Sequence, residues 1–149
     1  MQWLALAVFV ALTALAASFG AQFMPDAWYV GLAKPSWNPP NWVFGPVWTL
    51  LYIMIAVAGW LAWRALGFGA AVTLWGAQML LNGLWSYLFF GRHDITLAFV
   101  DIVLLLAAIV AFIVATWSRA RPAALLFLPY LAWVSFASAL NLAILRLNG

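Results

Sequence analysis

Residues 95–117, ITLAFVDIVLLLAAIVAFIVATW, decide the fold class of this chain, because they form an apolar run that contains one charged residue, Asp101. A helix needs about 20 such residues to cross a hydrocarbon core about 30 Å thick. Charged residues mark both ends of the run, with Arg92 and Asp94 before it and Arg119 after it. The run therefore predicts a transmembrane helix.

The composition of the whole chain extends this conclusion. Hydrophobic residues make up 69% and charged residues 6% of the 149 residues, and the mean hydropathy is +1.09. Ordinary soluble domains carry about 25% charged residues, so a soluble globular enzyme is excluded, as is a disordered chain. The absence of cysteine and the single histidine exclude a disulfide framework and a multi-histidine metal site. The net charge of +3 is too small and scattered for a nucleic-acid interface.

Four other segments have the length and composition of membrane spans. We therefore predict an all-α integral membrane protein, with residues 1–149 forming a single domain built as a bundle of five transmembrane helices. The first span is expected to be retained and not cleaved as a signal peptide, because the residues before it carry no Lys or Arg. The expected helices are residues 3–23, 44–63, 70–90, 95–117 and 122–145.

The orientation of these spans in the bilayer does not follow from their flanking charges. Lys and Arg flanking the spans set the orientation of most multi-pass proteins. Here each side would carry three of them, so the rule does not choose between the two orientations. One side has Lys34, Arg92 and Arg146, and the other has Arg64, Arg119 and Arg121.

The connection between the first two expected helices is long and rich in proline and tryptophan. Residues 25–48 read PDAWYVGLAKPSWNPPNWVFGPVW. Proline fixes φ near −65°, so this segment is expected to be a stiff, structured loop. Its tryptophans have two explanations, an aromatic belt at the membrane interface or a rigid aromatic cover that captures a flat, apolar ligand. Loops of this length in compact proteins are usually functional, and we favour the cover.

Polar and aromatic residues also recur at helical spacing inside three of the spans. Such residues are costly in a membrane unless they are satisfied. One explanation is hydrogen bonding between helices, worth about 0.6 kcal/mol per contact on average, which we expect for Asn141. The other, which we favour for the group, is an aromatic pocket with a few polar anchors. The stripes are Trp48 and Tyr52, then Gln78, Asn82 and Trp85, then Tyr130, Trp133, Ala137 and Asn141.

Two titratable residues are candidates for other roles. Asp101 has no second titratable group along a path, so we do not expect a proton carrier. We expect its carboxylate to face the bundle, paired with Arg92 or with a tryptophan N–H. His93 lies in the short charged turn Arg92-His93-Asp94 and is expected to be solvated.

Three stretches identify a family. Residues 28–52, WYVGLAKPSWNPPNWVFGPVWTLLY, residues 77–91, AQMLLNGLWSYLFFG, and residues 129–141, PYLAWVSFASALN, resemble the translocator protein / tryptophan-rich sensory protein family, also called the peripheral-type benzodiazepine receptor. The resemblance implies a five-helix bundle, commonly a homodimer, that binds tetrapyrroles such as protoporphyrin IX and haem. The ligand pocket would lie under the loop between the first two helices. No cofactor would be required.

Matched by position and combined with the stripes, the candidate ligand-binding residues are Tyr29, Pro39, Trp48, Tyr52, Gln78, Asn82, Trp85, Phe89, Phe90, Trp133 and Ala137. Trp28 and Trp133 match tryptophans implicated in light-dependent porphyrin breakdown in bacterial relatives, and they would be catalytic only if porphyrin is degraded. The mitochondrial pattern has a Tyr and Arg motif proposed for cholesterol. This chain keeps Arg146 without the tyrosine, which argues against high-affinity sterol binding.

The predicted function is that of a membrane receptor, sensor or carrier for porphyrins and related flat molecules, embedded in the lipid bilayer of a bacterial cell membrane. Two alternatives stay open. One is a light-dependent porphyrin-degrading enzyme that uses the pocket tryptophans. The other is a small-molecule transporter, which is disfavoured because an odd number of helices without an inverted repeat does not suit alternating access.

Overall fold

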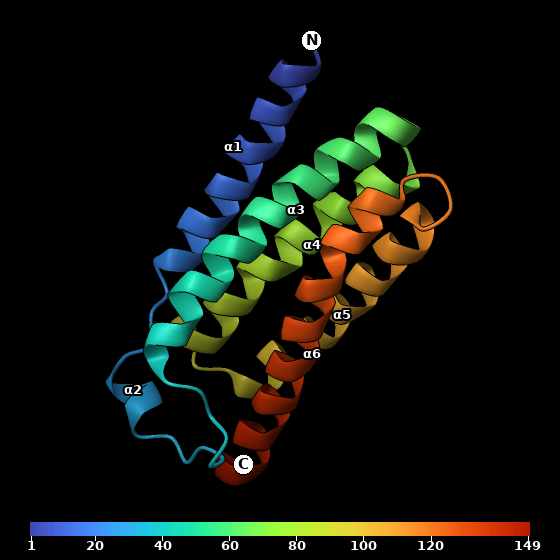
Figure 1. Ribbon diagram of the computed structural model, residues 1–149. Coiled ribbons are helices and arrows are strands. Elements are labelled where there is room, and N and C mark those ends of the chain that lie inside the picture. Colours follow the sequence, from blue (N-terminus) through green and yellow to red (C-terminus); the bar gives the residue numbers. More distant parts are fainter.

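The computed structural model describes residues 1–149, which form helices and no β-strand. Figure 1 shows the long helices lying side by side in a bundle, with α2 set apart at one end. The α-helices are α1 (Gln2–Ala21), α2 (Ala27–Val30), α3 (Phe44–Leu66), α4 (Ala70–Ser86), α5 (Ile95–Thr116) and α6 (Arg121–Asn148). A 3-10 turn, η1 (Asn41–Val43), precedes α3, and a π-helical turn, η2 (Tyr87–Gly91), follows α4.

The count of six α-helices corrects the prediction of five. The additional helix, α2, has four residues and begins after Asp26, whose carboxylate accepts a hydrogen bond of 3.1 Å from the Tyr29 N–H. Such a side chain at the cap satisfies one of the N–H groups that a helix start leaves free. A hydropathy pattern does not detect so short a helix. The predicted role of its loop as a rigid cover stays a prediction.

Four helices are long and apolar enough to cross a membrane, namely Gln2–Ala21, Asn41–Leu66 (η1 with α3), Ile95–Thr116 and Arg121–Asn148. The remaining predicted span, residues 70–90, is divided. Its α-helical part α4 has 17 residues, fewer than the roughly 20 that a span needs. The helical backbone continues through η2 to Gly91 with wider π-type turns, which commonly occur near functional sites.

Local chemistry explains where the long helices begin and end. The Asp94 carboxylate caps α5 by accepting from the Leu97 N–H at 2.9 Å. α3 ends at Gly67, whose φ of 69° lies in the left-handed region that glycine tolerates. Pro122 lies in the first turn of α6, where its missing N–H costs nothing.

The core is built mainly by α3, α4, α5 and α6, whereas α1 buries only Phe9 and Thr13. α1 packs closely on the others at one place. A Cβ added at Gly59 in α3 would lie 2.5 Å from the Trp75 indole nitrogen and 2.8 Å from the Phe9 ring. The Trp75 N–H donates to the Ile55 carbonyl of α3 at 2.8 Å. Glycine at position 59 therefore permits the contact between three helices.

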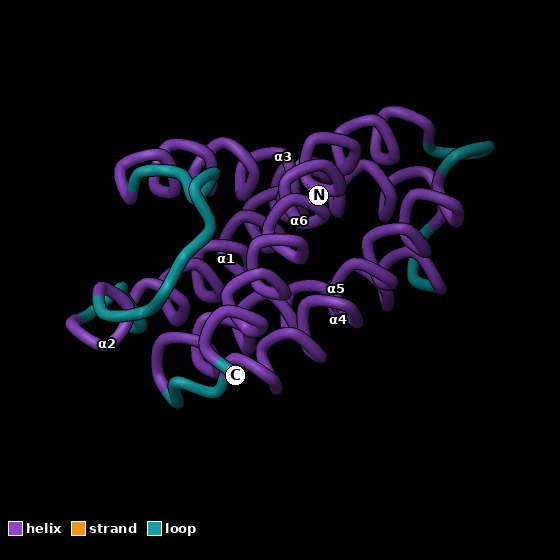
Figure 2. Tube along the Cα trace, turned by 90° about the horizontal axis from the view of Figure 1, so that it is seen from below, coloured by secondary structure: helices purple, strands orange, loops and turns teal.

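The two ends of the bundle differ, as Figure 1 shows. We call residues 22–43, 91–94 and 146–149 the loop end, and residues 64–69 and 117–121, with the amino terminus, the arginine end. Figure 2 shows the irregular segment that runs from α2 back to the start of α3 at the loop end. Two acidic residues are not buried, the exposed Asp26 and the half-buried Asp94, and both lie at the loop end. The arginine end has no acidic residue.

Candidate functional site

A chain of side-chain hydrogen bonds joins α3, α4 and α6. The Tyr52 hydroxyl donates to Asn82 Oδ1 at 2.9 Å, and Asn82 Nδ2 donates to the Tyr130 hydroxyl at 2.8 Å. That hydroxyl donates in turn to Gln78 Oε1 at 2.8 Å, and Gln78 Nε2 donates to the Trp75 carbonyl at 2.8 Å. Gln78 and Tyr130 are fully buried. The network supplies interhelical hydrogen bonds, the first of the two roles that the stripes suggested.

An aromatic group, which we call the Trp133 cluster, lies beside this network and consists of Phe44, Trp48, Tyr52, Trp133 and Phe136. The Trp133 ring meets Phe44 edge-on at 5.7 Å and Trp48 edge-on at 6.4 Å between ring centroids. Phe136 is tilted against it at 5.6 Å. The Trp133 N–H is buried and has no hydrogen-bond acceptor. A buried donor without a partner costs about 1–3 kcal/mol of stability. An acceptor atom of a ligand placed here would form a hydrogen bond with this N–H.

A second aromatic group, the Trp85 cluster, gathers Trp28, Tyr29, Trp85, Phe89 and Phe90. Trp85 stacks on Phe89 at 5.1 Å and meets Phe90 edge-on at 5.7 Å. Both phenylalanines lie in the π-helical turn η2. From the loop, Trp28 meets Phe89 at 5.7 Å and Tyr29 meets Phe90 at 5.4 Å. This cluster therefore joins α2 to the end of α4.

The Trp85 indole is also tied to α6. Its N–H donates to Asn141 Oδ1 at 2.9 Å, and Asn141 Nδ2 donates to the Ile95 carbonyl at 3.2 Å. The expectation that Asn141 serves interhelical hydrogen bonding is confirmed by these contacts.

The loop between α2 and η1 is attached to α6 at two points. Asn148 accepts from the Ala33 N–H at 3.0 Å and donates to the Ala33 carbonyl at 2.8 Å. The Trp37 ring meets Phe136 edge-on at 5.6 Å. Within the loop, the Lys34 ammonium lies 4.5 Å from the Tyr29 ring centroid. Burial raises the pKa of the Tyr29 hydroxyl above its usual range.

His93 is exposed, as predicted, but the prediction that it is merely solvated is incomplete, because its ring also makes specific contacts. Its ring stacks on Trp28 with centroids 4.2 Å apart and planes 11° apart. Its Nε2 lies 3.0 Å from Asp26 Oδ2. The hydrogen bond from the Tyr29 N–H lowers the pKa of the Asp26 carboxyl, and His93 lowers it further. His93 has a φ of 57°, an uncommon value for a residue with a side chain.

Asp101 is buried, but neither of its carboxylate oxygens has a hydrogen-bond partner. The expected pairing with Arg92 or with a tryptophan N–H is therefore wrong. Arg92 lies at the loop end, outside the helices, where it lines a surface hollow. The unpaired Trp133 N–H, the other buried polar group without a partner, does not meet this carboxylate either.

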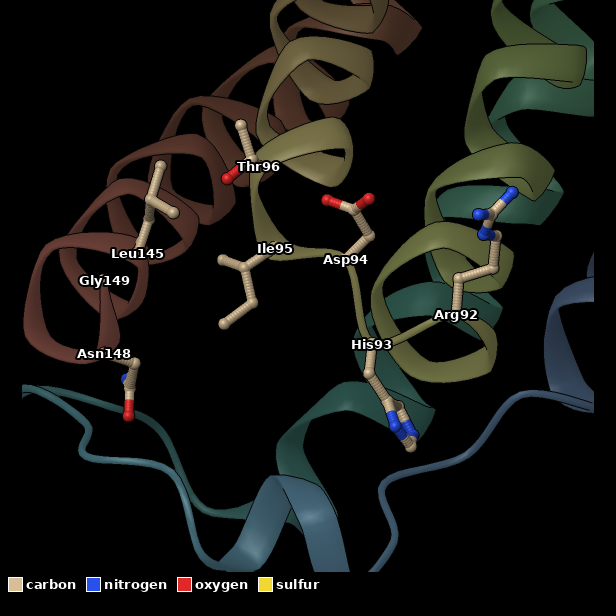
Figure 3. A pocket seen from close by; sticks show the side chains of 8 residues that line it. All are labelled: Arg92, His93, Asp94, Ile95, Thr96, Leu145, Asn148 and Gly149. Atoms are coloured by element: carbon tan, nitrogen blue, oxygen red, sulfur yellow. The ribbon is translucent and has the colours of Figure 1, made fainter.

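Two surface hollows lie at the ends of the bundle. The first, of about 320 Å³, is at the loop end, where Figure 3 shows the side chains around it. Its lining residues are Arg92, His93, Asp94, Ile95, Thr96, Leu145, Asn148 and Gly149. The second, of about 310 Å³, is at the arginine end. None of the predicted ligand-binding residues lines either hollow, because in this conformation those residues pack on one another.

The predicted site residues thus fall into two neighbouring groups. In the first group, Tyr52, Asn82 and Gln78 belong to the hydrogen-bond chain through Tyr130, Trp48 contacts the Tyr130 ring, and Trp133 contacts Trp48. The second group is the Trp85 cluster, with Trp28, Tyr29, Trp85, Phe89 and Phe90. Ala137 packs at the edge of the main core, and Pro39 is half-buried in the loop.

Sequence reasoning left Phe44 and Phe136 out of the ligand-binding set, although both contact Trp133. Phe136 follows Trp133 by three residues, a spacing that places both on one helix face, so that periodicity could have found it. Phe44 is the first residue of α3, and no sequence signal marks it.

The fold and its clusters define an integral multi-pass helical membrane protein with a tryptophan-rich site. The TspO/MBR family model matches residues 4–147. This chain belongs to the TspO/MBR family.

Curated relatives cover most of the chain. It is 45% identical to the tryptophan-rich protein TspO of Chlorobaculum tepidum, over 99% of this chain and 98% of that one. It is 36% identical to the tryptophan-rich sensory protein of Cereibacter sphaeroides, over 99% of this chain and 94% of that one. It is 40% identical to the translocator protein of Homo sapiens, over 81% of this chain and 75% of that one. Family membership therefore supports a role as a membrane sensor or receptor.

Proposed function

We propose that this protein is a membrane receptor or sensor that binds tetrapyrroles such as protoporphyrin IX or haem, and related flat apolar molecules, beneath the loop between α1 and α3. The ligand would lie against the Trp133 cluster and be anchored by the polar chain that includes Asn82. Two copies would form a homodimer in the bilayer.

The unpaired N–H of Trp133 is the observation that carries this proposal. It is buried among aromatic rings and lacks an acceptor. Ligand pockets are mostly apolar, with a small number of polar groups that fix orientation. A porphyrin presents a wide apolar face for the indoles and carboxylate oxygens for a donor. Its binding would both satisfy this N–H and bury the exposed edges of Trp48 and Trp133.

Ligand entry requires the loop to move, since the Trp133 cluster is packed in this conformation. The loop residues Ala33 and Trp37 are held to α6 by the Asn148 side chain and by one edge-on ring contact. These few contacts can open without breaking the hydrogen bonds of any long helix. We therefore propose that the loop residues 31–40 open and close over the ligand.

The test is a titration of the detergent-purified protein with protoporphyrin IX, followed by tryptophan fluorescence in the dark and then under light. We expect saturable quenching near one ligand per chain. The variant Trp133→Phe keeps an aromatic ring but removes the N–H, and it should weaken binding by about 10-fold, the effect of one lost hydrogen bond. Trp117→Phe, at the exposed arginine end, is the matched control and should bind as the wild type does.

Each outcome is decisive. Quenching that never saturates, or that is equally weakened in both variants, would show that porphyrin only partitions into the micelle, and the proposal would be wrong. A new absorbing product that forms in light and disappears in Trp133→Phe would extend the proposal from binding to porphyrin degradation. Binding without such a product would leave the protein a receptor or sensor.

A further inference from the structure

The arginine end of the bundle contains a hollow of about 310 Å³ that is lined by none of the residues of the proposed ligand site. It lies where the last turn of α3 meets the turn between α5 and α6. Two guanidinium-bearing residues and a set of small or apolar residues form its wall. The lining residues are Leu61, Arg64, Ala65, Arg119, Ala120, Pro122 and Ala123.

The positive charge of this hollow is not neutralised by the protein. Arg64 and Arg119 are exposed, and the ion pair that the chain makes, His93 with Asp26, is at the loop end. The first turn of α6 contains no acidic residue. The positive end of the α6 dipole is opposed by the negative carboxyl end of α3, so the charge of the hollow comes from the two guanidinium groups. An anion is therefore the chemically matched occupant.

The position of the hollow indicates what carries that anion. The Arg64 guanidinium lies over the Trp60 ring at 4.7 Å, and the Arg121 guanidinium over Trp117 at 4.9 Å. Tryptophans are enriched where hydrocarbon meets headgroups, and Trp117 is exposed, so we infer headgroup depth for the hollow. Leu61, which is half-buried and lies one turn before Arg64 in α3, extends its wall from headgroup depth toward hydrocarbon depth.

We propose that this hollow binds the phosphate of an anionic phospholipid, with Arg64 and Arg119 contacting the phosphate and the acyl chains lying along Leu61. Arg64 is held in place by its stack on Trp60, whose N–H donates to the Gln2 carbonyl of α1 at 2.9 Å. No residue of the Trp133 cluster or of the Trp85 cluster lines this hollow. Basic pockets between membrane helices bind lipid headgroups in this manner.

The test measures thermal unfolding of the full chain in uncharged detergent while phosphatidylglycerol is added. Phosphatidylcholine and inorganic phosphate at the same concentrations are the parallel arms. We expect saturable stabilisation by phosphatidylglycerol and at most weak effects from the other two. The double variant Arg64→Gln/Arg119→Gln should bind about 25-fold more weakly, because each basic residue at an anionic surface contributes roughly 5-fold.

Two matched variants separate a site from general surface charge. Arg92→Gln/Arg146→Gln removes the same charge at the loop end. It should change the phosphatidylglycerol concentration that gives half-maximal stabilisation by less than about 2-fold. Arg64→Lys/Arg119→Lys keeps the charge and should keep most of the binding, which also guards against a folding defect in the glutamine variant. Thermal unfolding without added lipid reports on folding in every case.

Three results would overturn the proposal. Equal stabilisation by phosphatidylcholine would mean that the charge of the lipid is not recognised. Equal losses in both glutamine double variants would mean that binding follows net charge and not this hollow. Inorganic phosphate that stabilises as well as the lipid, and with the same dependence on Arg64 and Arg119, would identify a free-phosphate site instead.

Discussion

The Asn82 side-chain amide donates a 2.8 Å hydrogen bond to the Tyr130 hydroxyl, and this bond joins α4 to α6 inside the bundle. Because the same hydroxyl donates to Gln78, one oxygen satisfies two amide side chains one helical turn apart. Fully satisfied buried networks rigidify a core, whereas partly satisfied ones are costly. The polar stripes therefore stabilise the scaffold on which the proposed ligand site rests.

Removing the Tyr130 hydroxyl is expected to destabilise the protein. Tyr130→Phe keeps the ring but leaves the Asn82 donor and the Gln78 acceptor unpaired in a buried place, at a cost of about 1–3 kcal/mol. Unfolding in mixed micelles measures the change. Tyr87→Phe is the control, since the half-buried Tyr87 hydroxyl makes no hydrogen bond, and its stability should match the wild type. Equal stability of the two variants would contradict the role assigned to the network.

The contact between α1, α3 and α4 depends on the absence of a side chain at position 59. Gly59→Ala would place a methyl group 2.5 Å from the Trp75 indole nitrogen, so the ring must shift and its hydrogen bond to Ile55 weakens. Overpacking of this kind costs about 1–3 kcal/mol. Gly76→Ala, in α4 with no atom within 4 Å of the added methyl, should be neutral or stabilise slightly. Thermal unfolding of the two variants tests this contrast.

The Asp26 carboxylate is expected to contribute stability that disappears in acid. Hydrogen bonding from the Tyr29 N–H and the proximity of His93 hold its pKa below the ordinary value of 3.8. A lowered folded-state pKa means that the contribution is complete above the unfolded value and is lost as the pH falls through the folded value. The midpoint temperature of thermal unfolding should therefore fall when the pH is lowered below about 4.

The variant Asp26→Asn isolates this effect. Asparagine still caps α2 through its oxygen but does not titrate. The midpoint temperature of unfolding should therefore fall less below pH 4 in this variant than in the wild type. Asp94→Asn, at the cap of α5, is the control and should keep the Asp26-dependent part of the fall. A pH profile of Asp26→Asn that coincides with the wild type would contradict the prediction.

The Asn148 side chain is expected to hold the loop closed. Asn148→Ala removes both hydrogen bonds to Ala33, so the Ala33 amide should lose its protection in hydrogen exchange while the long helices keep theirs. Asn148→Asp keeps the acceptor for the Ala33 N–H and should show an intermediate loss. If the protection around Ala33 stays unchanged in Asn148→Ala, the loop is held by other contacts.

Hydropathy and charge placement alone predicted the membrane class and, to within one residue, where each long helix begins. The long spans follow from the lengths of the apolar runs, as in α5, because the hydrocarbon core requires about 20 apolar residues per helix. Periodicity also grouped Gln78 with Asn82, and Trp133 with Tyr130, on their helix faces. The short helix α2 and the π-helical turn η2 were missed, since one depends on a single side-chain cap and the other on a local change of hydrogen-bond spacing.

The sequence by itself therefore determined that this protein is a helical membrane protein and which faces of its helices are polar or aromatic. Only the tertiary structure decided which faces meet. It paired Trp85 with Asn141 and Asn82 with Tyr130, left the Trp133 N–H and Asp101 without partners, and put His93 against Trp28. The physical reason is that helical periodicity is a property of one segment, whereas partner choice depends on how separate helices pack in space.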